Sequence, residues 1–409
     1  MIERMDALML PLNWQKVRLG DIGKPCMCKR VMKHQTTPYG EIPFYKIGTF
    51  GNTADAFISK KLFLEYKTKY SFPKKGDILI SASGTIGRAV IYDGKPAYFQ
   101  DSNIVWIDND ETLVKNDFLF YAYSNVKWNT EHTTILRLYN DNFRNTLIPL
   151  PPLNEQIAIA NILSDLDRYL CALDALILKK EGVKKALSFE LLSQRKRLRG
   201  FNQNWQRVRL GDMTTRFTKQ TGFDYSASIK PTLIKEQLPN YIPFIQNKDF
   251  LGHYINYKTD YFIPNEIAIR FPQILLNEKC LLISISGAIG NVAVFNHSQD
   301  AFIGGAIAVL KFKEKKSLDF VMHFLMSANG QKLLLNSVKS SSHKNLTIAD
   351  LRDLLIPLPP LNEQIAIANV LSDLDNEITS LKNKKRQFEN IKKALNHDLM
   401  SAKIRVLNK

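Results

Sequence analysis

Two short glycine-containing segments come closest, in residue type and spacing, to a motif that binds a ligand. They are Ser83-Gly84-Thr85-Ile86-Gly87 and Ser286-Gly287-Ala288-Ile289-Gly290, and each follows an apolar run typical of a β-strand. Backbone N–H groups in a glycine-rich turn can cradle a phosphate group. The same spacing also suits a tight turn that needs glycine only for its backbone conformation, and no helix signature follows. The sequence leaves both interpretations open.

Common catalytic motifs are absent from the sequence. It has no G-x-x-x-x-G-K-[ST] loop for a nucleoside triphosphate. It has no N-P-P-Y or D-P-P-Y tetrapeptide, with which amino-methyltransferases grip a flipped base, and no acidic pair followed by E-x-K to hold a nuclease Mg²⁺. The cysteines include one close pair and indicate neither a zinc site nor a disulfide framework; they are Cys26, Cys28, Cys171 and Cys280. We therefore expect no catalytic residue, no metal ion and no cofactor in this chain.

The composition favours a polyanionic partner. The 409 residues include 56 Lys and Arg against 39 Asp and Glu, a formal net charge of +17. Such an excess makes a nucleic acid the default partner, although ribosome-associated and membrane-surface proteins share it. No apolar run approaches the roughly 18 residues of a membrane span, and the opening MIERMDALML does not resemble a signal sequence. We expect a cytoplasmic protein without membrane contact.

An internal repeat is the strongest feature of the chain. Residues 147–167 recur as residues 355–375 with 20 of 21 positions identical, the exception being Ile162 against Val370. In each copy two prolines followed by Leu-Asn-Glu-Gln predict a helix start, because proline suits the threshold of a helix and asparagine can cap the N–H groups that follow. The repeat therefore indicates one unit built twice.

Beyond each helix start, apolar residues recur at alternating steps of four and three, the heptad pattern of a coiled coil. The first set is Ile159, Leu163, Leu166, Leu170, Leu173, Ile177, Leu187 and Leu191, and the second is Ile367, Leu371, Leu374, Ile378, Leu381, Phe388, Leu395 and Leu399. Four lysines interrupt these sets and are expected to set the register or to mark where the helices diverge; they are Lys180, Lys184, Lys385 and Lys392. At about 1.5 Å per residue, helices of about 38 residues would each be about 57 Å long. The alternative is that each helix packs on its own globular domain.

The segments ahead of the helices predict two α+β globular domains. Residues 13–23 and 204–214 are similar and alternate polar and apolar residues, as an entry strand does. Short β-branched runs broken by Gly, Pro, Asn and Asp follow, and helical patterns occur only late, near residues 116–124 and 317–335. The expected boundaries are 1–152 and 198–360 for the globular domains, 153–197 for the first helix, and 361–409 for the second helix with its tail.

The two halves differ in one informative way. Their helix starts are almost identical, whereas their globular domains share only scaffold fragments. Identical surfaces imply one kind of partner bound twice, and divergent surfaces imply two different ligands. The chain is therefore expected to read two unlike half-sites.

The order of domain, LPPLNEQ helix, domain and LPPLNEQ helix, with the SGTIG and SGAIG turns and the closing LMSAKIR, closely resembles the specificity subunit of type I restriction-modification enzymes. The resemblance covers essentially the whole chain. It implies two target recognition domains that read the halves of a split, asymmetric DNA site. It also implies that two paired antiparallel helices set the spacer, in a pseudo-twofold circular arrangement with the tail beside the first domain.

Further expectations concern partners. In the family that the chain resembles, two modification subunits dock on the helices and methylate adenine at N6 with S-adenosylmethionine, and motor-nuclease subunits join them. S-adenosylmethionine, ATP and Mg²⁺ are accordingly expected only in partner subunits. The resemblance implies that the specificity subunit itself performs no chemistry.

Candidates for DNA contact are Lys and Arg for phosphates, and Arg, Lys, Asn, Gln and Ser for base edges. In the first domain they are Lys29, Arg30, Lys33, Lys46, Ser83, Thr85, Arg88 and Asn103. In the second they are Lys219, Gln246, Lys248, Ser286, Lys339, Ser341, His343 and Lys344, the last four from a polar run that resembles a loop. For each of them the alternative is a solvated surface side chain.

Six residues of the helix starts are expected to bind a partner, because capping tolerates many sequences and does not demand the same residues twice. They are Asn154, Glu155, Gln156, Asn362, Glu363 and Gln364, and a purely structural role is the alternative. Two rival functions are a coiled-coil scaffold that binds nucleic acid without reading its sequence, and a self-contained nuclease or methyltransferase that acts without partners.

Overall fold

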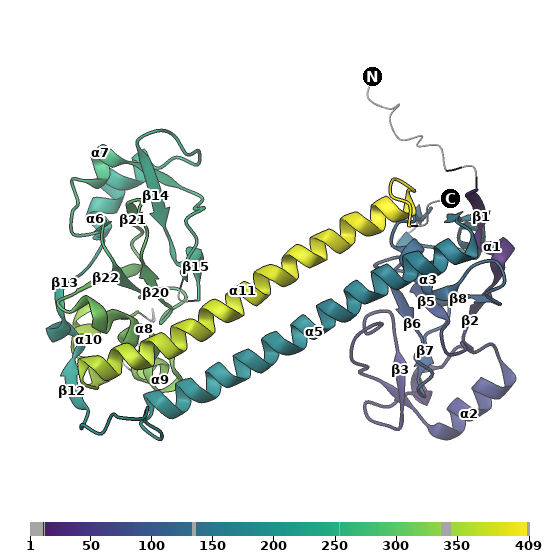
Figure 1. Ribbon diagram of the computed structural model, residues 1–409, viewed down its shortest axis with the longest axis horizontal. Coiled ribbons are helices and arrows are strands. Elements are labelled where there is room, and N and C mark those ends of the chain that lie inside the picture. The colour runs from purple at the N-terminus through teal and green to yellow at the C-terminus, as the bar shows by residue number, and fades with distance from the viewer. Residues whose placement is uncertain (1–10, 12, 133–135, 253, 337–344, 407–409) are drawn as a thin grey trace. The chain divides into compact units, whose positions relative to one another are not determined.

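The computed structural model describes residues 11, 13–132, 136–252, 254–336 and 345–406 (Figure 1). It divides into two compact units, one made of Met1–Ala175 with Asn383–Lys409 and the other of Leu176–Lys382. Each unit holds one globular domain and one end of both long helices. Within the described ranges no helix is long and apolar enough to cross a membrane.

A two-stranded antiparallel ladder ties the beginning of each globular domain to its end. Strand β1 (Gln15–Arg18) pairs with β11 (Leu147–Leu150), and strand β12 (Gln206–Arg209) pairs with β23 (Leu355–Leu358). In the first ladder the paired residues Val17 and Ile148 are buried and face the domain, whereas Leu147 is exposed. The predicted entry strands are therefore confirmed, and their partner strands β11 and β23 lead directly into the two long helices.

The two globular domains share one sheet topology. The first has a four-stranded sheet in the order β2-β8-β5-β6 and a smaller sheet β4-β3-β7, and the second has β13-β22-β19-β20 and β17-β14-β21-β18. In both smaller sheets one pair is parallel, β3 with β7 and β14 with β21. The α+β prediction is confirmed, and the weak sequence echoes mark a common scaffold.

The strands of the first domain are β2 (Gly23–Met27), β3 (Ile42–Tyr45), β4 (Phe57–Ile58), β5 (Ile78–Ser81), β6 (Ala89–Ile91), β7 (Tyr98–Phe99) and β8 (Ile104–Asn109). Those of the second are β13 (Thr214–Lys219), β14 (Tyr241–Ile245), β17 (Phe262–Pro264), β18 (Leu275–Leu276), β19 (Cys280–Ser284), β20 (Val292–Phe295), β21 (Ala301–Ile303) and β22 (Ile307–Phe312). Short hairpins are formed by β9 (Glu131–His132) with β10 (Leu136–Arg137) and by β15 (Phe250–Leu251) with β16 (Tyr254–Ile255). Short helices include α1 (Leu19–Ile22), α4 (Asn140–Asn145), α6 (Gly222–Asp224), α7 (Asn265–Ala268) and α10 (Ile348–Arg352).

The helices predicted late in each domain are present. They are α3 (Asn116–Tyr123) in the first domain, and α8 (Leu318–Met326) with α9 (Ala328–Asn336) in the second. The second helical stretch is interrupted at Ser327, whose hydroxyl bonds the Phe324 carbonyl oxygen at 2.6 Å. A Cβ on Gly330 in the first turn of α9 would lie 2.0 Å from that oxygen, so the close approach of α9 to the end of α8 requires glycine.

The expectation that helical patterns occur only late in each domain is wrong, most clearly for a ten-residue helix of the first domain. Helix α2 (Lys60–Lys69) lies in the middle of the first domain, with Ser59 as its N-cap accepting from the Leu62 N–H at 3.2 Å. Phe63 is its one fully buried residue, and most of its other side chains are charged or polar. A helix that buries so little has almost no apolar periodicity to recognise in the sequence.

The two long helices are α5 (Leu153–Leu192) and α11 (Leu361–Met400), each of 40 residues and thus about 60 Å long at about 1.5 Å per residue. In each unit they run antiparallel. Lys385 Nζ lies 2.6 Å from an Asp174 carboxylate oxygen in the first unit, and Lys180 Nζ lies 2.7 Å from a Glu377 oxygen in the second. The predicted antiparallel pairing is confirmed within both units.

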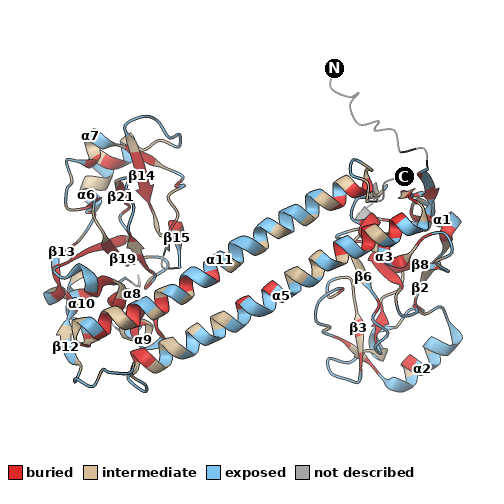
Figure 2. Ribbon diagram, in the orientation of Figure 1, coloured by how far each residue is buried: buried red, intermediate tan, exposed pale blue. Residues whose placement is uncertain are grey.

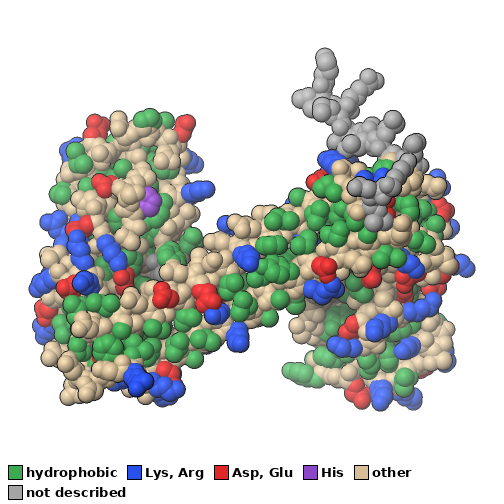
Figure 3. Space-filling view, in the orientation of Figure 1, with side chains coloured by type: hydrophobic (Ala, Val, Ile, Leu, Met, Phe, Trp, Pro, Cys, Tyr) green, Lys and Arg blue, Asp and Glu red, His purple; other side chains and the backbone are tan. Residues whose placement is uncertain are grey.

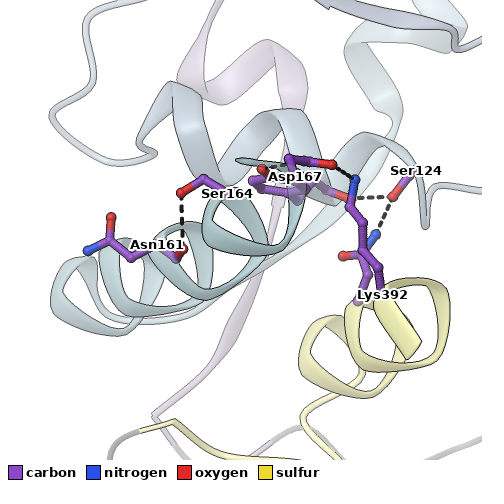
Figure 4. Close-up of polar contacts among 7 residues, drawn as sticks. Ser124, Asn161, Ser164, Asp167 and Lys392 are labelled. Carbon is purple, nitrogen blue, oxygen red and sulfur yellow. Dashed lines mark hydrogen bonds and ion pairs between the residues drawn. The ribbon is translucent and has the colours of Figure 1, made fainter. Parts of the chain in front are cut away.

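The predicted heptad positions face the partner helix or the adjoining domain. All sixteen are buried or half-buried, and Ile159, Leu163 and Leu371 are fully buried, whereas many neighbouring helix positions are exposed (Figure 2). The four lysines within the pattern each meet a carboxylate of the other helix, which supports their predicted role in setting register. The pairs are Lys180 with Glu377, Lys184 with Asp375, Lys385 with Asp174, and Lys392 with Asp167; the last is drawn in Figure 4.

A buried carboxylate closes each unit. Glu155, in the first turn of α5, accepts from Trp14 Nε1 at 3.0 Å and from Arg405 Nε and Nη2 at 2.7 and 3.0 Å. Trp14 precedes the entry strand, and Arg405 lies beyond the end of α11. The carboxylate therefore joins the start of the first domain, the start of one helix and the end of the other.

The second unit repeats this arrangement. Glu363 accepts from Trp205 Nε1 at 3.2 Å and from Arg197 Nε at 3.0 Å. The last residues of α11, Leu399 and Met400, and Val406 of the tail pack in the core of the first domain, as Leu191, Leu192 and the linker residue Leu198 pack in the core of the second. The expected circular arrangement, in which the tail meets the first domain as the linker meets the second, is confirmed.

We predict that replacing Glu155 by Gln lowers the free energy of unfolding by about 1.5–3 kcal/mol, because charged hydrogen bonds to Arg405 are lost. Glu363→Gln should cost a similar amount through Arg197. Glu389→Gln is the matched control: Glu389 is half exposed in its surface pair with Lys385, and such pairs contribute about 0–1 kcal/mol. Urea denaturation checks the series, and equal stability of the Glu155 and Glu389 variants would contradict it.

Candidate nucleic-acid interface

The two glycine-containing turns have the same internal hydrogen bonds. The Ser81 hydroxyl accepts from the Arg88 N–H at 2.9 Å and donates to the Thr85 carbonyl. The Ser284 hydroxyl accepts from the Asn291 N–H at 3.0 Å and donates to the Ala288 carbonyl. Gly84, Gly87, Gly287 and Gly290 all have positive φ. The turn is therefore one structure that occurs in both domains.

Two backbone N–H groups within each turn already bond carbonyl groups of the same loop. The Ile86 and Gly87 N–H groups donate to the carbonyls of Gly84 and Ser81 at 3.1 and 2.9 Å. The second domain repeats this, with Ile289 and Gly290 donating at 2.9 and 3.0 Å. A phosphate cradle requires N–H groups that point at the ligand. Of the two interpretations that the sequence left open, the geometry favours the tight turn.

In the first domain this turn is bonded to two other loops. We call residues 46–50, 83–88 and 100–103 the first loop cluster. Ser83 Oγ donates to Asn103 Oδ1 at 2.8 Å, Gln100 Oε1 accepts from the Ile47 N–H at 3.0 Å, and Arg88 Nη1 donates to the Phe50 carbonyl at 3.0 Å. Polar side chains of two segments thus bond each other and the backbone of the third, which joins the three loops in one framework.

The second domain assembles the equivalent loops, residues 246–249, 286–291 and 304–306, which we call the second loop cluster. Asn247 Nδ2 donates to the Ser286 carbonyl at 2.5 Å, and the Gly304 N–H donates to the Ile245 carbonyl at 2.8 Å. A hollow of about 270 Å³ opens here beside Lys248, Gly304 and Gly305. The backbone plan is shared, but the side chains that it presents differ from those of the first loop cluster.

Eight of the sixteen predicted DNA-contact residues lie in these clusters. Lys46, Ser83, Thr85, Arg88 and Asn103 are in the first, and Gln246, Lys248 and Ser286 are in the second. Lys29, Arg30, Lys33 and Lys219 lie on other segments, although Arg30 pairs with Asp101 of the first loop cluster at 2.8 Å. Lys339, Ser341, His343 and Lys344 lie outside the described residues.

The predicted DNA-contact residues of the two loop clusters differ in burial and in their bonding partners. Ser83 is buried and bonded to Asn103, so it holds the loops together, whereas Thr85 and Arg88 are exposed. Lys46 pairs with Asp55 at 2.9 Å, and Lys248 pairs with Asp260, which raises the Lys248 pKa. On the face drawn in Figure 3, Lys and Arg side chains mix with acidic ones in both units. Charge alone therefore does not locate the interface on that face.

One exposed residue of the second loop cluster was not predicted. Asn291 occupies the position of Arg88 in the shared turn, directly after the second glycine, and its side chain is exposed. The alignment of SGTIGR with SGAIGN contains this correspondence. It became meaningful only when the equal hydrogen bonds showed that the two turns are one structure.

Within the described residues there is no group of three or more His, Cys, Asp or Glu side chains placed to hold a metal ion. Burial raises the pKa of both Cys28 and Cys280 to about 12. Neither thiol is thus a ready nucleophile near neutral pH, since the thiolate is the reactive form.

The helix-start residues expected to bind a partner are mostly internal. Glu155, Gln156, Glu363 and Gln364 are at most 3% exposed. Gln156 Nε2 donates to the Pro151 and Leu113 carbonyls at 2.9 and 3.1 Å, and Gln364 Nε2 donates to the Pro359 carbonyl at 2.7 Å. These four side chains therefore lie inside their units, where each glutamate bonds an arginine and each glutamine bonds the Pro151 or Pro359 carbonyl.

The two remaining residues of that set, Asn154 and Asn362, are exposed at the first turns of the long helices. Larger surface features lie farther along these helices. In the first unit a hollow of about 880 Å³ is lined by Tyr121, Lys392 and His397, among others. In the second unit a hollow of about 540 Å³ is lined in part by His323 and Lys184.

The two hollows are equivalent by the repeat. Lys184, Lys185 and Glu181 of the second unit correspond, at the offset of 208, to Lys392, Lys393 and Glu389 of the first. In the first unit, Asn396 donates to Ser124 Oγ at 2.5 Å, and Tyr121 donates to Asp167 at 2.8 Å, beside the Lys392 contact of Figure 4. Each unit thus offers a similar surface where the helix pair meets α3 or α8.

Two copies of one α+β scaffold that present different exposed loops, each beside paired helices, define a two-domain recognition protein. The chain belongs to the family of type I restriction modification DNA specificity domains, whose model matches residues 11–180 and 202–390. The family matches once on each half of the chain, in agreement with the duplicated fold. The resemblance inferred from the repeated helix starts is confirmed.

Individual relatives agree with this assignment. The type I restriction enzyme MjaVIII specificity subunit of Methanocaldococcus jannaschii is 28% identical over 429 residues, which cover 99% of this chain and 96% of that protein. S.HindORF215P of Haemophilus influenzae is 64% identical over 148 residues, but the match spans only 36% of this chain and 38% of that protein. The crystal structure of the type I S subunit from M. genitalium shares the fold, with a TM-score of 0.63 at 18% identity over 96% of this chain and 98% of that one.

We predict that Gly87→Ala destabilises the first unit more than Gly84→Ala. Both residues have positive φ, which costs a side chain about 1–2 kcal/mol. A Cβ on Gly87 would also lie 2.1 Å from Trp128 Nε1, whereas a Cβ on Gly84 would find its nearest atom at 3.8 Å, on Ile47. Overpacking should add about 1–3 kcal/mol at Gly87 only. Thermal unfolding of both variants tests this, and equal losses would show that Trp128 does not crowd the turn.

Proposed function

We propose that this chain is the sequence-reading subunit of a type I restriction-modification complex, with each globular domain reading one half of a split, asymmetric DNA site. The observation that carries the proposal is the contrast between a shared turn and its different exposed residues. Ser81 and Ser284 make equal bonds in the two turns, whereas Thr85 and Arg88 stand where the second domain has Ala288 and Asn291. Two domains that share this turn but expose different side chains on it are suited to bind two different DNA sequences.

Sequence reading needs side chains that are presented rigidly to base edges, because base contacts specify while phosphate contacts position. Arg88 meets this need, since its backbone is bonded to Ser81 and its guanidinium to the Phe50 carbonyl. A scaffold that binds DNA only through phosphates needs many cations but no such framework. The loop clusters therefore favour sequence readout over the scaffold alternative.

The equivalent hollows support two copies of one partner. Each combines a Lys-Lys pair and a glutamate of a long helix with the end of α3 or α8. We propose that two modification subunits dock here, that they supply S-adenosylmethionine and adenine methylation, and that nuclease subunits join through them. In this proposal the chain itself contributes recognition and no chemical step.

The experiment that tests the function is to co-express the full chain with the modification subunit encoded beside it and to map methylated adenines by single-molecule sequencing. We expect one split asymmetric motif, methylated on both strands. A stable complex that methylates no defined motif would support the scaffold alternative. Failure to form any complex would contradict the docking proposal.

A second prediction concerns the helices as the element that sets the spacer. Inserting one heptad that continues the apolar pattern into both helices, after Ala175 and after Lys382, would lengthen each by about 10 Å. The spacer of the methylated motif should then grow by about three base pairs at about 3.4 Å each. Insertion into α5 alone is the control. It should abolish methylation, because the Lys392–Asp167 and Lys184–Asp375 pairs could then no longer form at the same time. An unchanged spacer with both insertions would refute this role.

A further inference from the structure

The residue that follows the second glycine of the shared turn differs in chemistry between the two domains. The Arg88 N–H donates to the Ser81 hydroxyl at 2.9 Å, and the Arg88 carbonyl accepts from the Ser81 N–H at 3.0 Å. Asn291 makes the same two bonds with Ser284, at 3.0 and 2.9 Å. Their Cα atoms are thus held in the same way, and both side chains are exposed. One backbone position therefore presents a guanidinium in one domain and a carboxamide in the other.

These two side chains suit different bases. A guanidinium donates two parallel hydrogen bonds to guanine O6 and N7, and a carboxamide both donates to adenine N7 and accepts from adenine N6. The bond from Arg88 Nη1 to the Phe50 carbonyl uses one of five guanidinium donors and fixes the direction of the group. A side chain fixed in this way loses less conformational freedom when it binds.

Taking the proposed function as its basis, we propose that Arg88 and Asn291 are equivalent base-contacting residues, with Arg88 reading a guanine in one half-site and Asn291 an adenine in the other. Neighbouring positions agree with different readers. Thr85 carries a hydroxyl where Ala288 has none, and the first loop cluster is closed by the Ser83–Asn103 bond where the second has a hollow beside Gly304 and Gly305. The same framework then gives each domain its own preference.

The competing role for Arg88 is a phosphate contact, which would add affinity without sequence preference. The two roles differ in how a substitution acts across sequences. Loss of a phosphate contact weakens binding to all sequences alike and reduces its salt dependence. Loss of a base contact removes discrimination at one base pair and leaves the remaining positions unchanged.

The test uses the full chain in complex with its modification subunit and the methylated motif of the wild type. Arg88→Asn and Asn291→Arg are made singly, and binding is measured to DNA duplexes in which each base pair of both half-sites is changed in turn. Arg88→Asn should reduce the preference for guanine at one position of one half-site by about 5- to 150-fold. Asn291→Arg should act on an adenine of the other half-site. In each variant the unaffected half-site reports that the complex is folded and assembled.

Lys61→Asn is the matched control, since it makes the same change of charge at an exposed position of helix α2. It should leave discrimination at every base pair as in the wild type. If Arg88→Asn weakens binding to all duplexes equally, Arg88 is a phosphate contact and the inference fails. Unchanged preferences at both half-sites in both variants would also overturn it. Either failure leaves a split motif in place, whereas a wild-type complex without such a motif refutes the proposed function instead.

Discussion

The structure of each unit depends on one buried carboxylate. Glu155 in the first unit and Glu363 in the second each receive an indole N–H from the start of a domain and a guanidinium from the segment beyond the end of the other long helix. Burying a carboxylate is costly unless donors surround it. In the first unit three segments far apart in sequence must therefore meet at this carboxylate, and in the second unit the linker after α5 must meet the start of α11. These contacts place each globular domain against the ends of both helices.

Much of this architecture follows from local patterns in the sequence. The repeat, its prolines and the heptad spacing predict helices that begin at Leu153 and Leu361, as observed. The four lysines within the heptad pattern predict a fixed register, and carboxylates of the opposite helix pair with them, as Asp375 does with Lys184. Periodicity records which face of a helix is apolar. Helix α2 escaped prediction because it buries little beyond Phe63 and so leaves almost no such record.

The candidate site could be predicted only in part, for a different reason. A repeated Glu-Gln pair in sequence does not reveal whether its side chains face a partner or the interior, and the indole and guanidinium that meet Glu155 lie 141 and 250 residues away. Likewise, Arg88 could be nominated from its charge, but Asn291 acquires meaning only from equal hydrogen bonds in the two turns. Long-range pairings of this kind leave no local trace in a single sequence.

The serines that bond both sides of the shared turn, Ser81 and Ser284, affect how the sequence of such a domain can change during evolution. The Ser81 and Ser284 hydroxyls bond backbone groups of the turn whatever side chains Thr85 and Ala288 carry, so these two exposed side chains need contribute little to folding. Substitutions at exposed positions away from such bonds usually alter stability by no more than about 0.5 kcal/mol. The residues that fold the turn are therefore different from the exposed residues at positions 85 and 288. Substitutions at those exposed positions can accumulate during evolution with little loss of folding stability.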